Sequence, residues 1–246
     1  MKTNIFTLKI ISFISLTFFT LSLSGFITYA PLQFAFQVLG YVCVPLFALI
    51  ILEGYKHTKS VNRYILRVFL IAVIAAVPHR YLCAAADNLF DPYLFFSAAL
   101  TGFFCLGSII LYERMNSRNT RIICIVFTVV VSFFLQLEFA PHALIIMYII
   151  HICKDKKFVE LAYYITSYCA VIAIVSAFML FMRSENTVEI KDELLQNLAI
   201  LGCIPALPLI KKYDGTKGPS CKIFSYVYYL LLLAVIVSIK VLGGEY

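Results

Sequence analysis

The chain has 246 residues, of which 62% are hydrophobic and only 13% are charged, and its mean hydropathy is +0.94. Soluble domains are roughly 45–50% apolar and about 25% charged, so this composition excludes a water-soluble fold and predicts a membrane protein in contact with lipid. The net charge of +7 is explained by Lys and Arg in cytoplasmic loops. We therefore expect no nucleic-acid partner.

Apolar stretches of about 20 residues predict membrane helices, because membrane strands would appear as alternating segments of about 10 residues. Nine such segments follow one another along the chain. They lie at 6–28, 32–52, 64–84, 93–112, 121–137, 142–153, 159–182, 194–210 and 222–242. The predicted fold class is an all-α, polytopic bundle of about nine transmembrane helices. With no linker or repeat, residues 1–246 are predicted to form a single integral membrane domain.

The first segment has two interpretations. It follows a basic start, MKTNIFTLK, and ends in ITYA with a small residue, as a signal peptide does. Its apolar run is longer than the usual apolar region of a signal peptide, which favours an uncleaved first span.

Every second predicted loop is basic. The basic loops carry Lys56, Lys59, Arg63, Arg114, Arg118, Arg121, Lys154, Lys156, Lys157, Lys211, Lys212, Lys217 and Lys222. The intervening loops carry few cations. Since basic loops face the cytoplasm, the alternation predicts a cytoplasmic N-terminus.

Polar residues gather where the second span ends, in PLFALIILEGYKHTKSVNRYILR (45–67). Glu53 and His57 are four residues apart, so they share a face if the helix continues. A carboxylate beside an imidazole can tune a general base, and an interfacial polar face explains the same pair equally well. Arg67 lies one turn inside the third span, where a charged side chain needs an explanation. There are three alternatives: the side chain extends to the cytoplasmic edge, it pairs with Glu53, or it binds a ligand.

A second group of polar residues lies on the predicted outer side. It consists of His79, Arg80, Asp87, Asn88 and Asp91 in one loop and of Glu138 and His142 in another. No H-x-x-x-H or H-E-x-x-H spacing joins them, so a solvated loop is favoured and no metal is predicted. The eight cysteines contain no CxxC pair and are interpreted as small buried hydrophobes.

The stretch at 40–95 resembles the TraX family, polytopic inner-membrane proteins whose founding activity is N-acetylation of conjugative pilin. The residues that carry this resemblance are Pro45, Leu46, Phe47, Ala48, Glu53, Gly54, His57, Thr58, Arg63, Tyr64 and Arg67. It continues through AVIAAVPHRYL to Asn88 and Phe90, and more weakly to LEFAPHALIIMYII.

The chain departs from the family pattern at two places. Where the family has an Asp-His pair in the first span, this sequence has Phe19 and Thr20. Near the C-terminus the family often has an aromatic pair followed by His-Leu, whereas Tyr228 and Tyr229 are followed here by leucines. Neither Phe nor Thr can replace an acid/base pair.

The resemblance implies a multi-pass acyltransferase of the bacterial inner membrane, which moves acetyl from acetyl-CoA to an amine or hydroxyl, such as a pilin N-terminus or an envelope polymer. It implies His57 and Glu53 as catalytic residues. The implied donor- and substrate-binding residues are Lys56, Lys59, Arg63, Arg67 and Asn88, and the outer polar cluster is His79, Arg80 and Asp91. A non-catalytic subunit that keeps the fold, and a transporter, remain alternatives. For a transporter we would expect repeated halves, which the sequence does not display.

Overall fold

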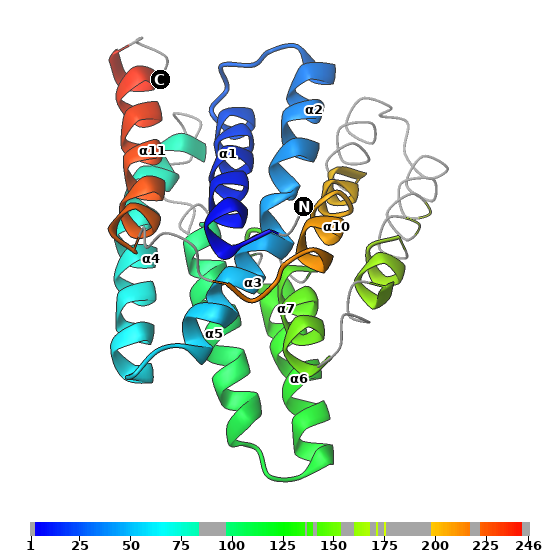
Figure 1. Cartoon of the computed structure of the whole chain (residues 1–246). Helices are drawn as coiled ribbons and strands as arrows, with labels where there is room; N and C mark the ends of the chain where they lie inside the picture. The colour runs from blue at the N-terminus through cyan, green and yellow to red at the C-terminus, as the bar shows by residue number, and fades with distance from the viewer. Residues whose placement is uncertain are drawn as a thin grey trace. The chain divides into compact units, whose positions relative to one another are not determined.

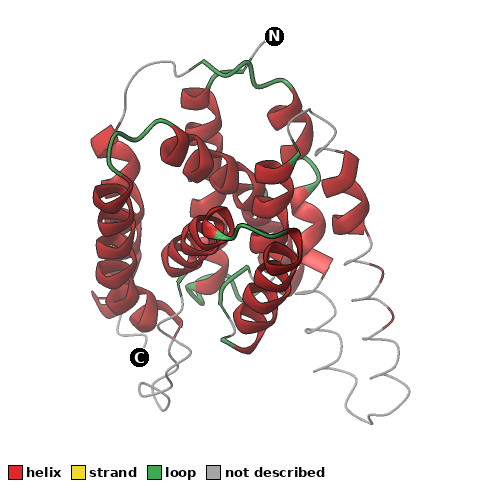
Figure 2. Ribbon diagram, turned by 90° about the horizontal axis from the view of Figure 1, so that it is seen from below, coloured by secondary structure: helices red, strands yellow, loops and turns green. Residues whose placement is uncertain are grey.

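A computed structural model describes residues 3–83, 97–135, 137–139, 142–153, 160–167, 171, 175, 198–216 and 222–242. These residues form helices joined by short loops, and no strand occurs among them (Figure 2). This confirms the all-α class. The chain divides into two compact units, one of residues 1–46 and 155–218 and the other of residues 47–154 and 219–246. The prediction of one membrane domain stays a prediction.

The first unit is built on α1 (Ile5–Leu23) and α2 (Ala30–Tyr41), which pack side by side (Figure 1). Asn4 caps α1 by accepting the Thr7 N–H at 2.9 Å, which satisfies a donor that the helix leaves open. The 3-10 helix η2 (Ala199–Cys203) packs on α2 and continues into α10 (Ala206–Lys211). Gly202 has Val38 and Tyr41 next to it, so a larger residue would not fit there.

The second unit holds the C-terminal part of α3 (Cys43–Lys56), then α4 (Val61–Cys83), α5 (Ala98–Arg114), α6 (Arg118–Phe134), α7 (His142–Ile152) and α11 (Lys222–Leu242). α4 packs against both α5 and α11, and α5 also packs against α6 and α7 (Figure 1). Nearly every residue of α7 is buried. The connections from α3 to α4 and from α5 to α6 are short, and the ends of α3, α5 and α7 meet through the contacts of Tyr55 and His151 with Glu113.

The side chains are distributed as in a membrane protein. Large apolar residues are exposed along α4 and α6, including Leu66, Ile74, Ile123, Phe127 and Phe134. Small hydroxyl residues are buried instead and bond to carbonyls of their own helices, for example Ser12 to Leu8 O at 2.7 Å and Thr128 to Cys124 O at 2.8 Å. A soluble protein rarely exposes such apolar surface, whereas membrane helices pack through small residues and face lipid with large ones.

Three helices of the described residues are long and apolar enough to cross a membrane: Ile5–Leu23, Ala30–Lys56 and Val61–Cys83. Shorter apolar helices are His142–Ile152, Ala199–Lys211 and Val227–Leu242. These helices overlap the predicted first, second, third, sixth, eighth and ninth segments, with shifted ends. The predicted span 194–210 is not one α-helix, because a 3-10 turn precedes Pro205, which lacks a backbone donor. The number of nine spans stays a prediction.

Candidate functional site

The helices α3, α5 and α7 each end in a last turn that carries a basic residue, Lys56, Arg114 and His151 respectively. The carbonyl groups at a helix C-terminus favour positive charge, which explains why these residue types lie there. Contacts between the three helix ends bring polar side chains together at one end of the second unit. We call this group, made of Glu53, Tyr55, Lys56, His57, Glu113 and His151, the helix-end cluster.

The predicted pair Glu53 and His57 is in contact. The helical turn continues past α3, since the His57 N–H donates to Glu53 O at 3.2 Å. His57 Nε2 lies 3.3 Å from Glu53 Oε2, and Lys56 Nζ lies 3.3 Å from Glu53 Oε1. The Glu53 side chain is 16% exposed and that of His57 is 49% exposed. The carboxylate is therefore held by the Lys56 ammonium and the His57 imidazole, and the imidazole is open to solvent or a ligand.

A second imidazole–carboxylate pair lies in the same cluster and was missed from the sequence. His151 Nε2 is 3.3 Å from Glu113 Oε1, and the Tyr55 hydroxyl donates to Glu113 Oε2. Lys56, which contacts Glu53 of the first pair, also lies close enough to His151 for its charge to act on the ring. One signal was available, because loop charges placed the ends of the second, fourth and sixth spans on one side.

The ring of His151 is fixed by aromatic packing. Tyr112 meets it edge-on with ring centroids 5.9 Å apart and meets Tyr148 at 5.7 Å. The guanidinium of Arg121 lies 5.4 Å from the Tyr112 ring centroid, within the range of a cation–π interaction. His151 Nδ1 is buried and has no hydrogen-bond partner among the described residues. A polar atom of this kind needs a partner, so this nitrogen is available to a ligand or water.

The connection from α3 to α4 explains why the sequence has a glycine at 54. A Cβ at Gly54 would lie 2.5 Å from the hydroxyl oxygen of Tyr64, and this hydroxyl donates to Ile51 O at 3.1 Å. Glycine therefore lets α4 approach the end of α3. Beyond Tyr64, Arg67 Nε donates to Arg63 O at 3.1 Å, and both side chains are exposed.

The remaining predicted cations are also exposed. Lys56 is the last residue of α3 and Lys59 lies in the α3–α4 turn. Arg63 and Arg67 follow, exposed, in the first two turns of α4. This arrangement suits an anionic ligand that approaches the end of the unit.

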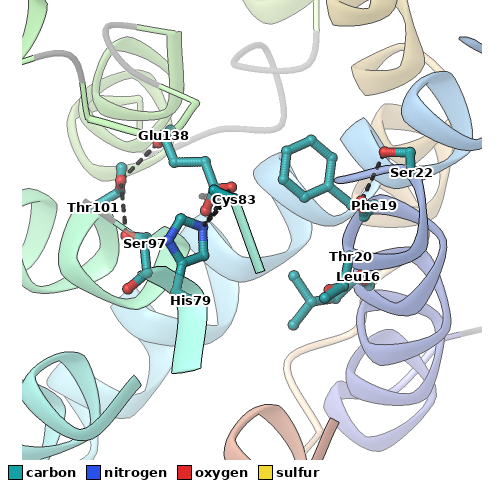
Figure 3. A network of polar contacts seen from close by, with 9 residues as sticks. All are labelled: Leu16, Phe19, Thr20, Ser22, His79, Cys83, Ser97, Thr101 and Glu138. Carbon is teal, nitrogen blue, oxygen red and sulfur yellow. Dashed lines mark hydrogen bonds and ion pairs between the residues drawn. The ribbon is translucent and has the colours of Figure 1, made fainter. Parts of the chain in front are cut away.

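The predicted outer residues lie in different environments. His79 is buried, and its Nε2 lies 3.3 Å from Glu138 Oε1 (Figure 3). Arg80 is partly buried, and its Nε is buried. Asn88 and Asp91 lie outside the described residues. The interpretation of this group as a solvated loop is wrong for His79, because burial of an ionisable side chain requires a partner, which Glu138 provides.

Within the described part of the chain, no group of three or more His, Cys, Asp or Glu residues is arranged to hold a metal ion. The cysteines described, at positions 43, 83, 105, 124, 153 and 203, are free thiols. In the first span, Phe19 and Thr20 are buried, and the Thr20 hydroxyl donates to Leu16 O at 2.7 Å (Figure 3). Phe19 packs edge-on against Tyr41, with centroids 6.0 Å apart.

An all-helical fold, exposed apolar helix faces and polar groups collected at helix ends define the class as a helical membrane protein. Within that class, the family model described as TraX protein matches residues 5–240. The chain belongs to the TraX family. Comparisons with curated proteins and with solved structures gave no match.

Proposed function

We propose that this chain is a membrane acyltransferase that binds acetyl-CoA at the helix-end cluster and transfers the acetyl group to an amine or hydroxyl acceptor. The observation that supports this proposal is that the helix-end cluster holds two imidazole–carboxylate pairs, Glu53–His57 and Glu113–His151, and that the chain continues from it with exposed cations. Acyl transfer needs a base for the acceptor and positive charge for the donor phosphates. Both kinds of group lie together here.

Each residue then has a role. Lys56, Lys59, Arg63 and Arg67 hold the phosphates of acetyl-CoA. His57 acts as the base, and Glu53 orients it and stabilises its protonated form. His151, fixed by Glu113 and Tyr112, offers its buried Nδ1 to a polar group of the donor.

The proposal includes a topology. With nine spans and a cytoplasmic N-terminus in the bacterial inner membrane, the helix-end cluster faces the cytoplasm, where acetyl-CoA is made. The basic loops that flank the cluster support this orientation. The acceptor is then a pilin-like N-terminus or an envelope polymer, and the role assigned to Asn88 remains part of this proposal.

The test is equilibrium binding of acetyl-CoA to the purified full chain in detergent. We expect saturable binding that His57→Ala and Arg67→Ala each weaken by about tenfold or more, which corresponds to about 1.4 kcal/mol. Arg118→Ala is the matched control, since Arg118 is an exposed cation at the start of α6 outside the cluster. Absence of binding at near-millimolar acetyl-CoA, in protein with a cooperative thermal transition, would refute the proposal. An equal loss in Arg118→Ala would refute the assigned site.

A second candidate is a non-catalytic subunit that keeps the family fold. The observation that favours it is the environment of Phe19 and Thr20, which occupy the place of the family's Asp-His pair and are fully engaged in helix packing. Folded protein that binds no acetyl-CoA and still co-purifies with a membrane partner would favour this alternative.

A further inference from the structure

A groove lies between α4 and α5 on the surface of the second unit. It is lined by Asn62, Ile65, Leu66 and Phe69 of α4 and by Phe103 of α5, and its volume is about 420 Å³. The α4 residues follow the spacing i, i+3, i+4, i+7, which places them on one face of that helix. Leu66 is 55% exposed and Phe69 is 41% exposed, so the groove is open along this face.

The groove is apolar at one end and polar at the other. The rings of Phe69 and Phe103 contact each other with centroids 5.2 Å apart. Asn62 lies two helical turns before Phe69, or about 10 Å along the axis. Arg63 follows Asn62 in the first turn of α4, which has no acidic residue, and both side chains are exposed. The apolar groove therefore leads from two aromatic rings to an amide and a guanidinium.

This order of chemistry matches that of a phospholipid. α4 is long and apolar enough to cross a membrane, so its exposed apolar face contacts lipid. A helix of 23 residues is about as long as the hydrocarbon core is thick, which places its first turn near the level of the lipid phosphates. At that level a guanidinium donates charge-assisted hydrogen bonds to a phosphate, and a side-chain amide donates a neutral one.

We propose that the groove between α4 and α5 is a binding site for an anionic phospholipid. One acyl chain lies along Ile65, Leu66 and Phe69, and the phosphate lies at Asn62 and Arg63. A net negative headgroup is favoured because clustered cations at a membrane surface attract anionic lipids. The groove extends over only two turns of α4, which suits a flexible acyl chain, whereas a second transmembrane helix would make contact over many more turns.

The lipid site goes beyond the proposed acyl transfer and does not depend on it. Arg63 is also one of the cations proposed to hold acetyl-CoA, so lipid binding is measured without acetyl-CoA. Asn62 belongs to the lipid site alone. Asn62→Leu should therefore weaken lipid binding and leave the affinity for acetyl-CoA unchanged. A chain that binds anionic lipid but no acetyl-CoA would keep the lipid site and refute the acyltransferase.

The experiment uses the absence of tryptophan from this chain, because a single introduced Trp then reports the lipid at one place. Phe69→Trp keeps an aromatic ring in the groove. Phe127→Trp is the matched control, since Phe127 is an exposed aromatic residue at a similar distance from the start of α6. α4 and α6 both begin at the lower end of the second unit in Figure 1, and α6 also begins with an exposed cation, Arg118. The two probes therefore differ in the groove.

Each full-length variant is reconstituted into phosphatidylcholine vesicles with increasing fractions of dibrominated phosphatidylglycerol, whose bromine atoms quench Trp fluorescence on contact. At Phe69→Trp we expect phosphatidylglycerol to be preferred about fivefold, which corresponds to about 1 kcal/mol, the contribution of one Arg near a membrane surface. At Phe127→Trp the quenching should follow the bulk lipid fraction. In the Phe69→Trp chain, Arg63→Gln should remove the preference and Asn62→Leu should reduce it about twofold.

Equal preferences at the two probes would overturn the inference, because surface charge alone would then explain the binding. A preference that persists in Arg63→Gln would overturn it as well. Inorganic phosphate should compete no better than sodium chloride at equal ionic strength, and stronger competition would indicate a site for a soluble anion instead of a lipid. If Phe69→Trp does not fold, Leu66→Trp replaces it, with Ile74→Trp as its control, because Leu66 and Ile74 are both 55% exposed on α4.

Discussion

The contact between α1 and α2 gives a prediction whose size can be worked out from the structure. Gly40 lies directly against Phe19, and a Cβ at position 40 would be 2.5 Å from Phe19 Cβ and 2.8 Å from Phe19 Cα. Ordinary contacts begin at 3.4 Å, so Gly40→Ala forces the two helices apart by about 1 Å. The atoms in the way belong to the backbone of α1 and to its first side-chain carbon, so no side-chain rotation relieves the clash.

Overpacking of this kind costs about 1–3 kcal/mol, and alanine returns up to about 1 kcal/mol through its helix propensity. We expect Gly40→Ala to lower the free energy of unfolding by about 1–2 kcal/mol. The matched control is Gly107→Ala in α5, where a Cβ meets nothing within 4 Å. There the propensity gain stands alone, and we expect slightly increased stability.

The assay uses the buried thiols. Cys43, Cys105, Cys124 and Cys203 are buried, so a dye that fluoresces on reaction with thiols reports unfolding during a thermal ramp in detergent. In a chain of this size 1 kcal/mol corresponds to about 2–4 °C in Tm. Gly40→Ala should therefore melt several degrees below wild type and Gly107→Ala at or above it. Equal Tm values for the two variants would refute the close approach of α1 and α2.

Two further predictions concern the second unit. In single-cysteine variants, a membrane-impermeant maleimide added to spheroplasts should label Cys83 and reach Cys153 only after lysis; the opposite pattern would place the N-terminus outside. Gly54→Ala should displace the Tyr64 hydroxyl and break its hydrogen bond to Ile51 O. We expect acetyl-CoA binding to weaken several-fold. The Tm should change by no more than about 4 °C, because alanine's helix propensity offsets the lost hydrogen bond. Unchanged acetyl-CoA affinity would show that the α3–α4 turn does not shape the donor site.

The fold was predictable wherever a helix depends on apolar length alone. Lys222–Leu242 has the predicted bounds, and Val61–Cys83 differs by a few residues at its start, because about 20 consecutive apolar residues favour a membrane helix. The region from Ala199 to Lys211 was predicted less well. Its hydropathy is that of a span, but Pro205 and the close contact of Gly202 with α2 depend on backbone geometry and packing that hydropathy does not measure.

The contacts in the candidate sites were predictable where they are local in sequence and not where they depend on packing. Glu53 and His57 are neighbours on one helical turn, so spacing alone predicted their contact. His79 and Glu138 are 59 residues apart, and only the packing of three elements brings them together. His151 was missed for a similar reason, since nothing in its local sequence indicates Glu113 as a partner.

Substitutions in the first span can distinguish a catalytic from a non-catalytic function of the chain. In the double variant Phe19→Asp with Thr20→His, the family's pair is restored in a place that packs an aromatic ring against Tyr41. Loss of a buried Phe side chain costs about 1.5–3 kcal/mol, and side chains at adjacent helix positions do not face each other, so the new charges would not neutralise one another. We expect a Tm loss of at least about 5 °C and no gain in acetyl transfer, measured against Phe19→Tyr as the control that keeps the ring. A gain of acetyl transfer with native stability would contradict this expectation. It would mean that the first span still faces a working site, and that this chain lost its catalytic residues there instead of using the histidines of the second unit.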